Sequence, residues 1–265
     1  MHIRLYDGWN YFRMIVEKDM TSLAPRRLYQ DMRDDNGVLH IWVWDGKGAR
    51  AARQEIFPDY KAKRKAAAND IYASIEYCRQ MLVHTTAYSI EVPGFEGDDV
   101  IAALVDHYTQ QGAQRIEVFS NDFDLSALAA GRPHVIGGWR VRDDVKPEDV
   151  QTYKTFKGDP SDNIPGVKSF GDKCWAAADK KVLRSIALAC LRQKPVDQLL
   201  PHMFLEEVRG EQSIKNWILE NQELIAAMWT VTGFIPVSQG ALVDYMQRPL
   251  HNPAKIEEML KLFLL

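Results

Sequence analysis

The sequence predicts an α/β protein with a mainly parallel central sheet flanked by helices, followed by a helical C-terminal part. Apolar, strand-like runs alternate with helical patterns through the first half of the chain, and most of these runs end at an acidic residue. From about Pro147 onward the pattern becomes helical. Strands interleaved with helices favour a parallel sheet that binds its ligands beyond the carboxyl ends of the strands.

The expected strands are short and occupy residues 3–6, 38–44, 88–92 and 116–119, of which the third is the weakest. A helix is expected at residues 98–108, and another carries Leu125 and Leu128. We expect a boundary near residues 143–147, which divides the chain into an α/β domain of residues 1–145 and a helical part of residues 146–265.

Nine carboxylates form five clusters, most of them at the ends of expected strands. Such strand ends gather at one edge of a parallel sheet, where like charges repel one another unless divalent cations hold them. Hard cations take oxygen ligands, so the pattern predicts metal-dependent phosphate chemistry. The clusters are Asp7; Asp45; Glu96, Asp98 and Asp99; Asp122 and Asp124; and Asp159 and Asp162.

Each cluster taken alone has an ordinary explanation. Acids in a first helical turn cap free N–H groups. Asp99 is the weakest member of its cluster, and for it a cap or a support for neighbouring ligands is the alternative to a metal ligand. Asp122 and Asp124 have the spacing of a turn. The shared position at one sheet edge is what favours a metal site.

Two segments carry positive charge. Residues 60–65 read Tyr-Lys-Ala-Lys-Arg-Lys, which is either a solvated helix face or a phosphate clamp in which Tyr60 stacks on a base. Residues 158–173 read as a turn between two helices, where backbone N–H groups together with Lys168 and Lys173 can meet a phosphate. An ordinary helix connection is the alternative for this second segment.

Composition is compatible with a nucleic-acid partner. The formal net charge of −3 becomes +6 when the nine clustered carboxylates are set aside, so the remaining surface is mildly basic. The three cysteines are far apart and form no Cys-x-x-Cys pair, which indicates a reducing cytoplasm. No apolar run approaches the ~20 residues of a membrane span, and the first residues lack a signal-peptide plan. We therefore expect no membrane association.

In these motifs the chain resembles the 5′-nucleases, the family of phage and bacterial 5′–3′ exonucleases and flap endonucleases. The matching pieces occur in the family order and span residues 6–173, and the most specific is Gly-Asp-x-x-Asp-Asn-Ile-Pro-Gly at residues 158–166. The other pieces are Tyr-Asp-Gly at 6–8, Trp-Asp-Gly at 44–46, Phe-Pro-Asp-Tyr-Lys-Ala-Lys-Arg at 57–64, Phe-Glu-Gly-Asp-Asp at 95–99 and Asn-Asp-Phe-Asp at 121–124.

The resemblance implies a PIN-like catalytic domain with a short helical arch and a DNA-binding part with a helix-three-turn-helix. It implies two Mg²⁺ ions, replaceable by Mn²⁺, one held by Asp7, Asp45, Glu96 and Asp98 and one by Asp122, Asp124, Asp159 and Asp162. Asp99 is counted with the metal-binding acids. Lys61 and Arg64 match the catalytic basic residues at the base of the arch. The DNA-binding set comprises Tyr60, Lys63, Gly166, Lys168, Gly171 and Lys173. The resemblance also implies that K⁺ binds to the helix-three-turn-helix at residues 158–173, called the hairpin below.

The expected activity is hydrolysis of DNA phosphodiester bonds at or near 5′ ends, flaps or nicks, by a monomer in a bacterial cell or a phage-infected host. Ser169 stands where the family commonly has Gly, and Cys174 where it has Ser or Thr, so the hairpin geometry departs from the family pattern. Two alternatives remain open, a PIN-type ribonuclease and a non-catalytic protein that binds DNA junctions. The specific segment at 158–173 argues against the first, and the full acid set argues against the second.

Overall fold

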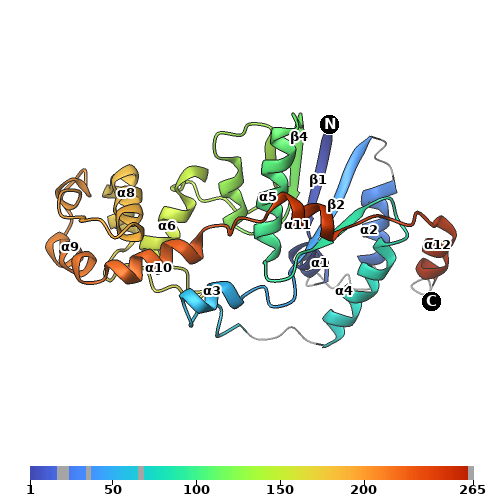
Figure 1. The fold of residues 1–265 in the computed structure, drawn as a ribbon, viewed down its shortest axis with the longest axis horizontal. Helices are drawn as coiled ribbons and strands as arrows, with labels where there is room; N and C mark the ends of the chain where they lie inside the picture. Colours follow the sequence, from blue (N-terminus) through green and yellow to red (C-terminus); the bar gives the residue numbers. More distant parts are fainter. Residues whose placement is uncertain (17–23, 34–36, 65–68, 262–265) are drawn as a thin grey trace. The chain divides into compact units, whose positions relative to one another are not determined.

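The computed structural model describes residues 1–16, 24–33, 37–64 and 69–261, whose elements are drawn in Figure 1. The chain divides into two compact units, one of residues 1–49, 66–140 and 235–265 and one of residues 50–65 and 141–234. The predicted boundary at 145/146 lies close to the passage at 140/141, but residues 50–65 and 235–265 fall in the unit opposite to the expected one. The division into a catalytic domain of residues 1–145 and a DNA-binding part of residues 146–265 stays a prediction.

A six-stranded sheet forms the centre of the first unit, with the strand order β5-β4-β1-β2-β3-β6. Neighbouring strands are parallel except β6, which pairs antiparallel with β3. The mainly parallel sheet predicted from the sequence is therefore confirmed. The strands are β1 (His2–Asp7), β2 (Val38–Trp44), β3 (Tyr88–Glu91), β4 (Arg115–Phe119), β5 (Val135–Gly137) and β6 (Met246–Gln247).

Aromatic side chains fill one face of this sheet. Tyr6 of β1 lies opposite Trp42 of β2, and their rings stack with centroids 4.4 Å apart. Together with Trp44 and Phe12 they form a buried cluster that receives side chains from α1, α2, α4 and α12. Successive strand residues point to opposite faces, so Ile3 and Leu5 belong to the other face of β1.

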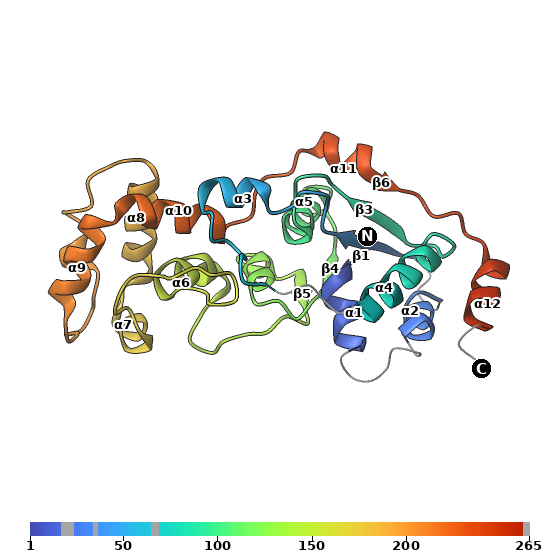
Figure 2. The same ribbon diagram turned by 90° about the horizontal axis from the view of Figure 1, so that it is seen from below.

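The helices of the first unit surround the sheet. Helix α5 contacts β1 and β2, and α11 contacts α5 and β3. Figure 2 shows α11 and β6 lying beside β3. The helical elements are α1 (Gly8–Val16), α2 (Ala24–Arg33), α4 (Asn69–Leu82), α5 (Gly97–Gln110), the 3₁₀ helix η2 (Asp124–Ala129), α11 (Gln239–Tyr245) and α12 (Pro253–Lys261).

The second unit is helical, as predicted for the C-terminal part. Helix α10 lies at its centre and contacts α3, α6, α8 and α9. The guanidinium of Arg53 on α3 is buried and donates to the carbonyl oxygens of Val231 and Gly233, which ties residues 50–56 to the end of α10. The elements are α3 (Ala51–Ile56), η3 (Pro147–Asp149), α6 (Val150–Lys157), α7 (Asp172–Ala177), α8 (Lys180–Leu191), η4 (Leu200–His202), α9 (Glu211–Glu220) and α10 (Gln222–Thr232).

Three elements differ from expectation. The helix expected around Leu125 and Leu128 is the six-residue 3₁₀ helix η2, and β5 and β6 were not expected from the sequence. Among the described residues, none of the helices has both the length and the apolar character needed to cross a bilayer.

Candidate metal centre

The carboxyl ends of three neighbouring strands carry the first group of acids. Strand β1 lies between β2 and β4 and is parallel to both, so Asp7 at its end occupies the middle of this edge. Asp45 directly follows β2, and Asp122 follows β4 after two residues. The predicted gathering of these three carboxylates at one edge therefore agrees with the strand order.

Asp7 lies in an environment that disfavours its negative charge. One carboxylate oxygen accepts from the Ser120 hydroxyl at 2.8 Å and the other from the Asn10 backbone N–H at 3.2 Å. The pKa of Asp7 is raised from 3.8 to about 7, first by burial and further by the negative charges of Asp45 and Asp122, although the two hydrogen bonds lower it. A divalent cation would relieve this repulsion, and the all-oxygen donor set suits Mg²⁺.

The acids at residues 96–99 occupy the start of α5, which follows β3. Glu96 is the N-cap and forms a capping box with Asp99. The N–H of Gly97 donates to Asp45 Oδ1 at 2.7 Å, so the helix start is attached to the end of β2. A Cβ at residue 97 would lie 3.3 Å from the same oxygen, which explains why a small residue stands there.

Asp99 is predicted either as a metal ligand or as a support for its neighbours, and its contacts bear on that choice. Its side chain is fully buried, with no exposed surface. One of its carboxylate oxygens accepts from the Glu96 N–H at 3.2 Å and the other from the Ile235 N–H at 2.7 Å. Both oxygens are therefore committed to backbone donors, and the alternative that Asp99 supports its neighbours fits the contacts better.

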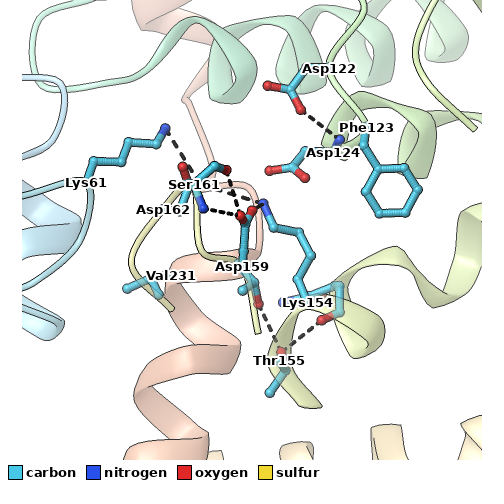
Figure 3. A network of polar contacts seen from close by, with 12 residues as sticks. Lys61, Asp122, Phe123, Asp124, Lys154, Thr155, Asp159, Ser161, Asp162 and Val231 are labelled. Carbon is cyan, nitrogen blue, oxygen red and sulfur yellow. Dashed lines mark hydrogen bonds and ion pairs between the residues drawn. The ribbon is translucent and has the colours of Figure 1, made fainter. Parts of the chain in front are cut away.

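The loop after β4 is held by its own polar groups. The carboxylate of Asp122 accepts from the Asp124 N–H at 3.0 Å (Figure 3), and the Asp122 N–H donates to Ser120 Oγ at 3.1 Å. Asn121 exchanges two hydrogen bonds with Asn10 of α1. Asp122 and Asp124 thus occupy a turn, as their spacing indicates, and both are only half-buried.

In the second unit, Asp159 and Asp162 lie among basic side chains, as Figure 3 shows. Lys154 of α6 is 4% exposed, and its Nζ lies 2.7 Å from Asp159 Oδ2 and 3.6 Å from Asp162 Oδ2. Arg64 Nη2 lies 2.7 Å from Asp162 Oδ1. Burial raises the pKa of Asp159, but Lys154 and Ser161 lower it more, and the net pKa is below the ordinary value.

The basic segment at residues 57–64 is attached to the same turn. Lys61 is 7% exposed with φ of 53°, its N–H donates to the Asp162 carbonyl at 3.0 Å, and its Nζ lies 3.9 Å from Asp162 Oδ2. The solvated-face interpretation therefore fails for Lys61, whereas Lys63 and Arg64 are exposed. Tyr60 is 3% exposed, with cations of Arg53 and Lys61 over its ring. The ring of Tyr60 therefore packs inside the second unit, and its stacking on a base stays a prediction.

The predicted hairpin occupies the residues between α6 and α7. Gly158 and Gly166 have positive φ and face each other, because a Cβ on Gly166 would lie 2.5 Å from the Gly158 nitrogen. Ser169 adopts φ of 66°, a conformation that explains a common Gly at this position, and Cys174 Sγ donates to its carbonyl oxygen. Lys168 and Lys173 are exposed, as a phosphate-binding role requires, and Gly171 is the residue before α7.

The predicted second cluster draws its members from both units, Asp122 and Asp124 from the first and Asp159 and Asp162 from the second. Its assembly around one metal ion stays a prediction. Sequence reasoning missed Lys154, Ser120 and Asn10. Ser120 contacts Asp7 across 113 residues, which no local pattern reports. Asn10 lies three residues after Asp7, and Lys154 lies one turn before the Gly158 motif, so short spacing was the available signal for these two.

An acid-lined edge on a mainly parallel, helix-flanked sheet defines a class of α/β proteins suited to metal-dependent phosphate chemistry. Comparison with known proteins narrows this class. Residues 24–155 match the family model described as the 5′-3′ exonuclease N-terminal resolvase-like domain. The chain belongs to this 5′-nuclease family, as its motifs indicated.

Two curated relatives and one solved structure illustrate the similarity. The chain is 29% identical over 158 residues to a 5′-3′ exonuclease of Aquifex aeolicus, covering 56% of this chain and 54% of the relative. It is 31% identical over 157 residues to the thermostable DNA polymerase I of Thermus thermophilus, covering 56% of this chain and 18% of the polymerase. The chain thus spans about half or less of these relatives.

The fold is similar to that of a bacteriophage T5 flap endonuclease crystallised with DNA and metal ions. The TM-score is 0.59 at 16% identity, and the match covers 100% of this chain and 98% of the T5 chain. At this identity the likeness concerns the fold alone.

Proposed function

We propose that this protein is a Mg²⁺-dependent 5′-nuclease that hydrolyses DNA phosphodiester bonds at or near 5′ ends, flaps or nicks. The observation that carries the proposal is the position of Asp7, Asp45 and Asp122 at the carboxyl ends of three neighbouring parallel strands. Burial and the neighbouring carboxylates raise the pKa of Asp7 there to about 7. Such a site gains stability from a cation. The family membership and the DNA and metal ions named for the T5 structure support the choice of substrate.

In the proposed mechanism, Asp7, Asp45, Glu96 and Asp98 hold one metal ion, and Asp122, Asp124, Asp159 and Asp162 hold a second. Bound Mg²⁺ supplies Lewis acidity that makes a water nucleophilic and stabilises the leaving oxygen. Ser120 and the Asn10 N–H fix the orientation of the Asp7 carboxylate.

Basic residues of the second unit perform the remaining tasks in the proposed mechanism. Lys61 and Arg64 offset the charge that develops on the scissile phosphate. Both contact Asp162, so the carboxylate orients them before the substrate arrives. Lys168 and Lys173 bind the phosphate backbone of the duplex away from that bond, and Lys63 and the N–H groups near Gly166 and Gly171 add further contacts.

We propose further that the protein acts as a monomer in a reducing cytoplasm, in keeping with the free thiols of Cys78, Cys174 and Cys190. Mn²⁺ is proposed to replace Mg²⁺, and K⁺ to bind backbone carbonyls of the hairpin.

The test is cleavage of end-labelled flap, nicked and single-stranded DNA and of matching RNA in Mg²⁺. Asp45→Asn and Asp122→Asn should nearly abolish cleavage while the metal-free fold stays as stable or becomes slightly more stable, because each removes one repelling charge. Asn keeps the oxygen that accepts from the Gly97 or the Asp124 N–H, so local structure is retained.

Asp106→Asn is the matched control, since Asp106 is an exposed acid on α5 that pairs with Arg132. Full activity of Asp45→Asn or Asp122→Asn would remove that residue from the site. Preferential cleavage of RNA would favour the PIN-type ribonuclease, and tight binding without cleavage in Mg²⁺ or Mn²⁺ would favour the junction-binding protein.

A further inference from the structure

The chain returns from the second unit to the first between Phe234 and Ile235. On the second-unit side, buried Arg53 donates to the carbonyl oxygens of Val231 and Gly233. On the first-unit side, the Ile235 N–H donates to Asp99 Oδ1 at 2.7 Å, across 136 residues of sequence. The return of the chain is thus fixed by a buried ionisable side chain on each side.

Asp99 is completely buried, and a buried carboxylate is costly unless hydrogen bonds satisfy its oxygens. An ionised carboxylate is an acceptor only, and backbone N–H groups are suitable partners. The Ile235 N–H binds one oxygen and the Glu96 N–H binds the other at 3.2 Å. The chain return and the start of α5 therefore share one carboxylate.

From Asp99 the contacts continue to two predicted metal ligands. Glu96 is the N-cap of α5 and is only 4% exposed. The next residue, Gly97, donates its N–H to the Asp45 carboxylate at 2.7 Å, and Gly46 donates to the Phe95 carbonyl at 2.9 Å. The loop that presents Glu96 and the loop that presents Asp45 are consequently one hydrogen-bonded structure, attached through Asp99 to Ile235.

We infer that Asp99 is a positioning residue through which the returning C-terminal segment holds the metal-binding acids in place. The inference rests on the proposed metal site and assigns Asp99 to its support instead of its ligand set. Groups that orient ligands in this way typically change metal affinity by about 10- to 100-fold when altered.

The decisive variant is Ile235→Pro, which removes the N–H donor without replacing any of the carboxylate residues. It should weaken Mn²⁺ binding, measured by electron paramagnetic resonance without DNA, by about 10- to 100-fold. It should also speed hydrogen exchange at the Glu96 and Gly97 amides. Asp99→Asn should weaken Mn²⁺ binding similarly and speed exchange at the Glu96 or the Ile235 amide, because an Asn side chain can accept from only one of the two N–H groups.

Asp106→Asn, an exposed acid on the same helix, is the control and should change neither quantity. If Asp99→Asn weakens Mn²⁺ binding while Ile235→Pro binds like the wild type, Asp99 is a ligand and the inference is overturned. Unchanged exchange at both the Glu96 and the Ile235 amides in folded Asp99→Asn overturns it too, including when Ile235→Pro does not fold. If the wild type binds no Mn²⁺, the proposed function fails, whereas amide exchange still decides whether Asp99 connects the two segments.

Discussion

Three aspartates of this chain differ in what surrounds their carboxyl groups. Burial and neighbouring charges raise the pKa of Asp7 to about 7, while Lys154 holds the pKa of Asp159 below its ordinary value. Asp99 is buried against two backbone N–H groups. The acid-rich motifs of this chain therefore contain three kinds of carboxylate. One lies near other negative charges, one is paired with a lysine, and one accepts hydrogen bonds from backbone N–H groups.

The environment of Asp7 predicts how pH affects the metal-free protein. Its folded-state pKa lies above the ordinary 3.8, so the folded protein binds this proton more tightly than the unfolded chain. The contribution of Asp7 to stability is fully present below pH of about 4 and is lost as pH rises to about 7. Asp7→Asn should remove this part of the pH dependence.

Thermal melts in EDTA between pH 4.5 and 8, compared between wild type and Asp7→Asn, measure it. The stability difference should shift in favour of the variant as pH rises, and Mg²⁺ should reverse that shift for the wild type. If the melting temperatures of the two proteins in EDTA change with pH in the same way, Asp7 does not cause this pH dependence. Asp106→Asn controls for the loss of a surface charge.

The ion pair between Lys154 and Asp159 predicts a second effect, on the stability of the metal-free protein. Lys154→Met should destabilise the metal-free protein by about 3 kcal/mol, because it leaves a largely buried carboxylate without its cation. Lys157→Met on the same helix removes the ion pair with the exposed Asp172 and should cost less than about 1 kcal/mol. Urea unfolding at pH 7 in EDTA provides both values, and equal losses would mean that the Lys154 pairs contribute no more than a surface ion pair.

At the scale of elements, the sequence was most informative where buried strands are long enough to show a pattern. The expected strands at 3–6, 38–44 and 116–119 correspond to β1, β2 and β4 within one residue at each end, because each is an apolar run in or beside the centre of the sheet. Strand β5 has three residues and β6 two, so neither contains enough alternation to recognise.

The candidate site was predictable where it depends on topology and not where it depends on tertiary contacts. Parallel strand order places Asp7, Asp45 and Asp122 at neighbouring strand ends. Whether Asp99 faces a cation or an N–H depends on Ile235, 136 residues away, and the burial of Tyr60 involves Arg53. No local pattern reports such contacts.

Substitutions in the basic segment and in the hairpin should affect different steps, the first the cleavage rate and the second the binding of DNA. Lys61→Ala should chiefly lower the rate of single-turnover cleavage if it removes one electrostatic donor at the scissile phosphate. The activation free energy should then rise by roughly 2–4 kcal/mol. Lys168→Ala and Lys173→Ala should instead weaken DNA binding and reduce its salt dependence by about one unit of slope per lost phosphate contact.

Binding titrations across salt in Ca²⁺, paired with single-turnover rates in Mg²⁺, distinguish the two roles. Lys61→Gly is the matched variant, since glycine adopts the positive φ of residue 61 without strain. Slow cleavage by both Lys61 variants assigns the effect to the lost side chain. Normal cleavage by Lys61→Ala once DNA is bound would show that the segment has no role at the scissile bond.

At the scale of the whole molecule, neither unit is a continuous piece of sequence. The first unit needs residues 235–265, because β6 extends its sheet and Ile256 and Met259 of α12 enter its core cluster. The second unit takes in residues 50–65, which leave the first unit between β2 and α4. The predicted division at residue 145 would separate the sheet from its own edge strand.

Family membership predicts the polarity of the reaction on DNA. With Mg²⁺, a duplex labelled at one end should release products from its 5′ side, and a hairpin-closed DNA without a free 5′ end should be spared unless it carries a flap. The expectation depends on recognition of a 5′ terminus or flap by the protein as a whole, so charge-neutral changes outside the acidic and basic groups should leave polarity unchanged. Product mapping on 5′- and 3′-labelled strands measures it. Efficient digestion from a 3′ end with the 5′ end intact would contradict the assignment, even if Asp45→Asn abolished that digestion.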